Sequence, residues 1–136
     1  MEEQLETAVE TYLSALREAD VHRVLSLFAP DAVVHSPLYG PLAPSDFYPR
    51  LFADTSAANL ELRSVMHGRD ATGVRTMSFW FHFDWRLPSG AAAPFDVIDA
   101  VTLDDEGRFT SLHILYDTVD VRPAFEAEAG RPSWRP

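Results

Sequence analysis

The hydrophobic pattern of the N-terminal part of the chain is helical. Between Glu2 and Ala19 apolar residues recur every three or four positions, and glutamates occupy much of the remaining surface. This period is typical of the buried face of an amphipathic helix. A second helix is expected from Val21 to Phe28, with Asp20 as its N-cap. A third is expected from Asp46 to Ala53, where Pro49 fits only within the first turn.

The rest of the chain favours strands. The turn Asp104–Gly107 supplies a glycine where a hairpin needs a positive φ. Helices followed by antiparallel strands indicate an α+β domain. A strongly curved antiparallel sheet wrapped around the helices would enclose one conical cavity. We expect this single domain to span residues 1–122 and residues 123–136 to form a loosely held C-terminal tail. The predicted strands are Ala32–Ser36, Leu60–His67, Gly73–Leu87, Pro94–Leu103 and Arg108–Thr118.

The long predicted strand Gly73–Leu87 alternates between two kinds of side chain. In one interpretation the aromatic set forms the core and the polar set faces outward. In the other, Trp80, His82 and Asp84 line the cavity and the phenylalanines are buried in a dimer interface, since an exposed apolar face of this size needs a partner. The sequence leaves both open. The aromatic set is Phe79, Phe81, Phe83, Trp85 and Leu87, and the polar set is Trp80, His82, Asp84 and Arg86.

Composition excludes several classes of function. The 136 residues suffice for one domain with a core, and the net charge of −10 argues against nucleic acid and anionic membrane surfaces as partners. Without cysteine there is no disulfide, zinc–thiolate site or thiol nucleophile. We see neither a signal peptide nor an apolar run of about 18 residues, so we expect a cytoplasmic protein.

Asp99 is the main candidate for chemistry. It lies in the apolar run Val97–Val101, where a charge costs several kcal/mol unless it is paired, hydrogen-bonded or neutralised. Asp99 therefore either faces water or is held protonated in a pocket as a working acid. Tyr12 lies on the buried stripe of the first helix, so its hydroxyl needs a partner inside the protein.

The histidines leave two acid–base candidates, His35 and His82. No group of histidines and carboxylates has the spacing of a metal site, so we predict no metal. Motifs for a catalytic serine, a phosphate loop or a dinucleotide are also missing from the sequence. If the protein is an enzyme, we expect acid–base chemistry on a small molecule without a cofactor.

Two stretches resemble the ketosteroid isomerase family, which belongs to the NTF2-like/SnoaL-like superfamily. They are the proline-rich turn HSPLYGP and the ending DVIDAVTLDDEGRFTSLHILYDTVDV, and the likeness runs from about Ala8 to Val121. The resemblance implies an NTF2-like (cystatin-like) cone, in which a strongly curved antiparallel sheet wraps around three N-terminal helices and a deep apolar pocket. It also implies a homodimer through the sheet and an apolar small molecule as ligand.

The resemblance further implies roles for particular residues. Tyr12 and Asp99 fall on the two oxyanion-hole donors, of which the aspartic acid is kept neutral by an apolar site. Ser36 stands where the family has its general base, so His82, His35 or Asp84 would have to replace it. Phe28 and Phe52 stand where some members have supporting tyrosines. The residues predicted to line the pocket are Ser36, Trp80, Asp84, Val97, Leu112, Ile114, Tyr116, Phe28 and Phe52.

Three functions remain as alternatives. The first is an enzyme that enolises an apolar, steroid- or polyketide-like carbonyl compound, as an isomerase or an aldol-type cyclase. The second is a non-catalytic binding domain, which the serine at position 36 favours. The third is hydration in the manner of an epoxide hydrolase, for which Asp99, Arg86 and Asp84 supply the residue types of an Asp–Arg–Asp arrangement.

Overall fold

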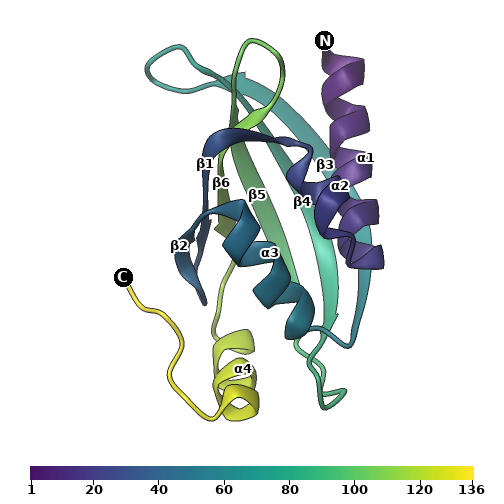
Figure 1. Ribbon diagram of the computed structural model, residues 1–136, viewed down its shortest axis with the longest axis vertical. Helices are drawn as coiled ribbons and strands as arrows, with labels where there is room; N and C mark the ends of the chain where they lie inside the picture. Colours follow the sequence, from purple (N-terminus) through teal and green to yellow (C-terminus); the bar gives the residue numbers. More distant parts are fainter.

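The structure is a computed structural model that describes all of residues 1–136. Three helices, α1 (Glu2–Glu18), α2 (Val21–Leu25) and α3 (Pro44–Ala53), lie on one face of a curved six-stranded sheet (Figure 1). A fourth helix, α4 (Val121–Ala129), lies at one end of the molecule. The predicted α+β class is confirmed. The strands are β1 (Phe28–Ser36), β2 (Gly40–Leu42), β3 (Ala57–Arg69), β4 (Arg75–Arg86), β5 (Phe95–Leu103) and β6 (Phe109–Leu115).

The sheet has the strand order β2-β1-β6-β5-β4-β3. Strands β3 to β6 form an antiparallel meander, whereas β1 pairs with β6 in parallel. The sheet is therefore mixed, although we expected it to be wholly antiparallel. A parallel pair needs a long crossover, and here the chain passes through β2, α3 and three further strands between β1 and β6.

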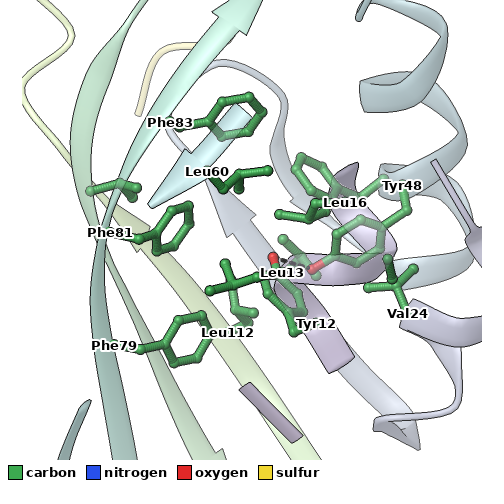
Figure 2. Close-up of a cluster of buried hydrophobic side chains, with 14 of the residues drawn as sticks. Tyr12, Leu13, Leu16, Val24, Tyr48, Leu60, Phe79, Phe81, Phe83 and Leu112 are labelled. Atoms are coloured by element: carbon green, nitrogen blue, oxygen red, sulfur yellow. Dashed lines mark hydrogen bonds between the residues drawn. The ribbon is translucent and has the colours of Figure 1, made fainter. Parts of the chain in front are cut away.

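The core decides between the two interpretations of the long strand. Phe79, Phe81 and Phe83 of β4 are almost fully buried, and Figure 2 shows them pointing across the core toward Tyr12 and Tyr48. Because successive side chains of a strand point to opposite faces, the intervening residues of β4 must lie on the outer face. The aromatic set is thus the core set, as the first interpretation predicted.

The C-terminal tail is not loosely held, which corrects our expectation. Residues 121–129 form α4, and Arg122 donates from Nη2 to the carbonyl oxygen of Pro37 at 2.9 Å. The backbone N–H of Trp134 donates to the carbonyl of Leu38 at 3.0 Å. At Gly40, whose φ is +78°, an added Cβ would lie 2.7 Å from the Trp134 ring. The tail therefore packs on the turn that joins β1 to β2.

Two remaining expectations concern the surroundings of the protein. None of the helices combines the length and the apolar character that a membrane crossing requires. The homodimer through the sheet stays a prediction. The apolar side chains that such a dimer would cover are Trp80, Ile98 and Leu115, which stand side by side on the outer face of β4, β5 and β6.

Candidate functional site

An apolar cavity lies between the helices and the inner face of the sheet. Fifteen residues line it and 13 of them are hydrophobic; the two others are Ser36 and Asp99. Its free volume of about 40 Å³ has room for a few water molecules. The lining residues are Tyr12, Leu16, Ser36, Leu38, Tyr39, Phe47, Leu51, Phe81, Phe83, Trp85, Phe95, Val97, Asp99, Ile114 and Tyr116.

Asp99 reaches this cavity from the middle of β5, where it pairs with Phe79 of β4 and Ile114 of β6. Its side chain is 2% exposed, and its Oδ1 atom has no hydrogen-bond partner. Burial raises the pKa of the carboxyl group from 3.8 to about 8, and the nearby Tyr12 hydroxyl offsets part of that rise. At neutral pH most molecules therefore carry Asp99 as a neutral acid, which can donate a hydrogen bond.

Tyr12 reaches the same cavity from α1. Its hydroxyl forms a 2.8 Å hydrogen bond with the hydroxyl of Tyr48 from α3, drawn as a dashed line in Figure 2. Burial raises the pKa of both phenols well above the usual value, and the nearby Asp99 carboxyl raises both further. Both tyrosines are consequently neutral at any physiological pH and remain hydrogen-bond donors.

Tyr48 supplies the partner that Tyr12 requires, which sequence reasoning missed. We placed the supporting positions at Phe28 and Phe52, but these two residues do not line the cavity and pack against the Tyr48 ring at centroid distances of 5.8 and 6.1 Å. The third helix does carry a signal, since Phe47, Tyr48 and Leu51 follow a helical stripe. A tyrosine on a buried stripe requires a partner for its hydroxyl.

Ser36, at the position of the family's general base, holds the backbone of a turn. Its Oγ accepts hydrogen bonds from the N–H groups of Leu38 and Tyr39, both at 3.2 Å. Ser36 lines the cavity as predicted, but nothing hydrogen-bonded to it is basic enough to activate its hydroxyl.

The predicted base His82 and its neighbours Trp80 and Asp84 lie outside the cavity, so their predicted placement in the pocket is wrong. His82 Nδ1 is 3.1 Å from Asp96 Oδ1 on the outer face. Asp84 pairs there with Arg86 at 3.6 Å, and the Trp80 side chain is 41% exposed. The physical reason is the strand period: burying the phenylalanines of β4 turns every intervening residue outward.

The other candidates divide between the cavity and its surroundings. Val97, Ile114 and Tyr116 line the cavity as predicted, whereas Leu112 belongs to the core beside it. His35 is on the outer face of β1, where its ring stacks on that of His113 at a centroid distance of 4.1 Å. His35 therefore has no access to the cavity.

Tyr39 is a cavity residue that sequence reasoning did not identify. Its hydroxyl donates a 2.6 Å hydrogen bond to Asp54 Oδ2. Burial raises the pKa of Tyr39, and the hydrogen bond to Asp54 raises it further. We interpreted the proline-rich segment only as a loop, because side-chain directions in a loop follow no period that the sequence could reveal.

Comparison with known proteins identifies the family. The family model of the SnoaL-like domain matches residues 9–112. The chain belongs to the SnoaL-like family. A search of curated proteins found no matching sequence.

Solved structures agree with the SnoaL-like fold. PrhC from Penicillium brasilianum has a TM-score of 0.73 at 12% identity over 94% of this chain and 89% of its own. The epoxide hydrolase/cyclase-like enzyme SalBIII, described in pyran ring formation in polyether salinomycin, has a TM-score of 0.68 at 16% identity over 88% and 95%. An NTF2-like protein from Exiguobacterium has a TM-score of 0.66 at 16% identity over 81% and 98%. At these identities the likeness shows the fold alone.

The cavity thus offers Asp99 and Tyr12 as donors, and its lining also includes the hydroxyl-bearing residues Ser36, Tyr39 and Tyr116. Asp99 and Tyr12 both line this cavity and can donate hydrogen bonds to a molecule bound there. The Asp–Arg–Asp arrangement does not form, because Arg86 and Asp84 pair with each other on the outer face.

Proposed function

We propose that this SnoaL-like protein is a cofactor-independent enzyme that enolises an apolar carbonyl compound, as an isomerase or an aldol-type cyclase. The observation that carries the proposal is the buried, neutral carboxyl of Asp99, whose Oδ1 has no partner in an otherwise apolar cavity. A neutral acid at this place stabilises the negative charge that develops on the carbonyl oxygen during enolisation.

Tyr12 is the second donor to the same oxygen in this proposal. When the Tyr12 hydroxyl turns toward a bound carbonyl, Tyr48 can donate to the Tyr12 oxygen and thus strengthen Tyr12 as a donor. The apolar walls lower the local dielectric constant and so increase the strength of these hydrogen bonds. Both donors are already buried in the protein before the substrate binds.

The cavity also bears on the size of the substrate. Its free volume of about 40 Å³ is far below the roughly 300 Å³ of a typical ligand pocket. Binding of a ring-sized compound therefore requires lining side chains to move. We expect a small or flat substrate to be accepted more readily than a four-ring steroid.

Enolisation can be tested without the natural substrate. In D₂O, an enolising enzyme exchanges the α-hydrogens of cyclohexanone for deuterium, which proton NMR detects directly. We expect Asp99→Ala to slow this exchange by about 100-fold or more, the effect of removing one oxyanion-hole donor. Asp99→Asn keeps an N–H donor and should be slowed less.

A matched control is available in the same strand. Asp96 is on the outer face of β5, so Asp96→Asn should exchange at the wild-type rate. Equal rates in the wild type, Asp99→Ala and Asp99→Asn would sink the proposal.

The second candidate function is binding without chemistry. It is favoured by Ser36, which holds a turn and supplies no base. A planar phenol such as 2-naphthol, titrated by its fluorescence, would then bind in the cavity while no ketone exchanges its α-hydrogens. Exchange by the wild type rejects this candidate.

A further inference from the structure

The cavity has a second polar end, formed by Tyr39. Tyr39 stands in the turn between β1 and β2, where Ser36 Oγ accepts its backbone N–H. Its ring packs edge-on against Phe47 of α3 and Phe125 of α4, at centroid distances of 5.4 and 5.3 Å. The residue at the base position of the family thus fixes the turn that presents the Tyr39 ring to the cavity.

The Tyr39 hydroxyl is connected to a carboxylate. Asp54 is the C-cap residue of α3, and its backbone N–H donates to the carbonyls of Arg50 and Leu51. Its Oδ2 accepts a hydrogen bond from the Tyr39 hydroxyl, with 2.6 Å between the two oxygen atoms. Because the hydroxyl already donates to Asp54, the free lone pair of the phenol oxygen is an acceptor.

Asp54 also lines a second hollow, which contains Glu128 and Arg131. This hollow has a volume of about 230 Å³, and most of its charged lining comes from α4 and the residues after it. Tyr39 lines the inner cavity while its partner Asp54 lines the outer hollow. The pair therefore connects the apolar cavity to a wetter compartment.

We propose that Tyr39 and Asp54 form a proton relay that serves as the general base missing at position 36. This inference rests on the proposed enolisation and deepens it. In the step, the C–H bond next to the carbonyl breaks and its electron pair forms the C=C bond of an enolate. The π pair of the carbonyl moves onto its oxygen, where hydrogen bonds from Asp99 and Tyr12 stabilise the negative charge. The released proton binds the Tyr39 oxygen as the Tyr39 hydroxyl proton passes to Asp54 Oδ2.

The relay leaves Tyr39 neutral and makes Asp54 a carboxylic acid. The reverse transfer returns a proton to carbon, at the same or at a conjugated position. Asp54 exchanges its proton with solvent through the outer hollow, so deuterium enters from D₂O. Burial and the hydrogen bond to Asp54 keep the pKa of Tyr39 high, so Tyr39 is a neutral phenol before and after the step.

Other polar and charged groups lie close to the relay. Tyr116, after β6, and Arg131, after α4, are close enough to Tyr39 to act on its charge. Glu128 of α4 lines the outer hollow, where its carboxylate accepts hydrogen bonds from Ser89. Asp54 is the only one of the carboxylates lining this hollow that is hydrogen-bonded to Tyr39.

The experiment measures α-deuteration of cyclohexanone in D₂O across pD 4 to 9 for the wild type, Tyr39→Phe, Asp54→Asn and Asp54→Glu. Asn accepts the Tyr39 hydrogen bond but takes no proton, so it preserves the contact and removes the base. We expect Tyr39→Phe and Asp54→Asn each to lower the rate by about 100-fold, the lower range of general-base catalysis. Asp54→Glu should recover part of the rate.

The pD profile separates a relay from a packing role. The wild-type rate should depend on pD through an acid limb, and this limb should be absent in Asp54→Asn. Asp96→Asn on the outer face should keep both the rate and the limb. If Tyr39→Phe does not fold, as circular dichroism would show, the two Asp54 variants still decide the matter.

Each outcome bears on one of the two proposals. If Asp99→Ala slows exchange but Asp54→Asn keeps the wild-type rate and acid limb, the relay is wrong and the enolisation proposal stands. A slow Tyr39→Phe beside an unaffected Asp54→Asn assigns Tyr39 a packing role and also rejects the relay. If the wild type exchanges no α-hydrogen, enolisation is wrong and the relay falls with it.

Discussion

The burial of Asp99 predicts an unusual dependence of stability on pH. The pKa of Asp99 is about 8 in the folded protein, against an ordinary value of 3.8 that we take for the unfolded chain. Between these values the folded state keeps a proton that the unfolded chain has already released. Folding therefore takes up a proton, and raising the pH through this range destabilises the fold. Asp99→Asn removes the titrating group and should remove this part of the pH dependence.

The magnitude follows from the two pKa values. They differ by about four, and each pKa unit corresponds to about 1.4 kcal/mol. The titration of Asp99 should therefore leave the free energy of unfolding unchanged below about pH 4. Above about pH 8 it should have lowered that free energy by about 5–6 kcal/mol. Between pH 5 and pH 7 the wild type should lose about 3 kcal/mol relative to Asp99→Asn.

Urea unfolding at half-unit pH intervals from 5 to 8.5 measures this difference directly. Subtracting the free energy of unfolding of the variant from that of the wild type at each pH cancels the contributions of all other titrating groups. Asp96→Asn, which changes an exposed carboxylate of the same strand, should run parallel to the wild type. A difference between the wild type and Asp99→Asn that stays constant within 0.5 kcal/mol (about a third of the shift expected per pH unit) would refute a buried acid with a raised pKa.

Two further predictions concern the support of the site. Tyr48→Phe leaves the buried Tyr12 hydroxyl without its partner and should lower the free energy of unfolding in urea by about 1–3 kcal/mol. The double variant Tyr12→Phe/Tyr48→Phe should lose less stability than the two single variants together. Strict additivity would contradict the coupling. Gly40→Ala places a Cβ 2.7 Å from the Trp134 ring and should expose the tail to trypsin, as followed by mass spectrometry. Gly73→Ala, with a positive φ but open space around it, is the matched control, and equal tail cleavage in both variants would contradict the packing.

The family and the site were accessible from sequence to different degrees. The run around Asp99 and the stripe of α1 identified the two donors, because a carboxyl or hydroxyl in an apolar segment requires a specific explanation. The same logic applied to Tyr48, but the comparison with the family directed attention to Phe28 and Phe52 instead. Tyr39 and Asp54 carried no periodic signal, since one stands in a turn and the other at the end of a helix.

What the sequence by itself determined is local: three helices, the long strands, and the division of β4 into an aromatic and a polar set. Periodicity assigns residues to faces, but it does not say which face meets the helices. Only the tertiary structure decided that Phe79 points inward and His82 outward, because that choice depends on what packs against the sheet. It also decided that Ser36, at the position of a base, holds the turn of Tyr39, and that Tyr39 meets Asp54 across 15 positions of the chain. Such contacts arise from the path of the backbone in space, which no local pattern encodes.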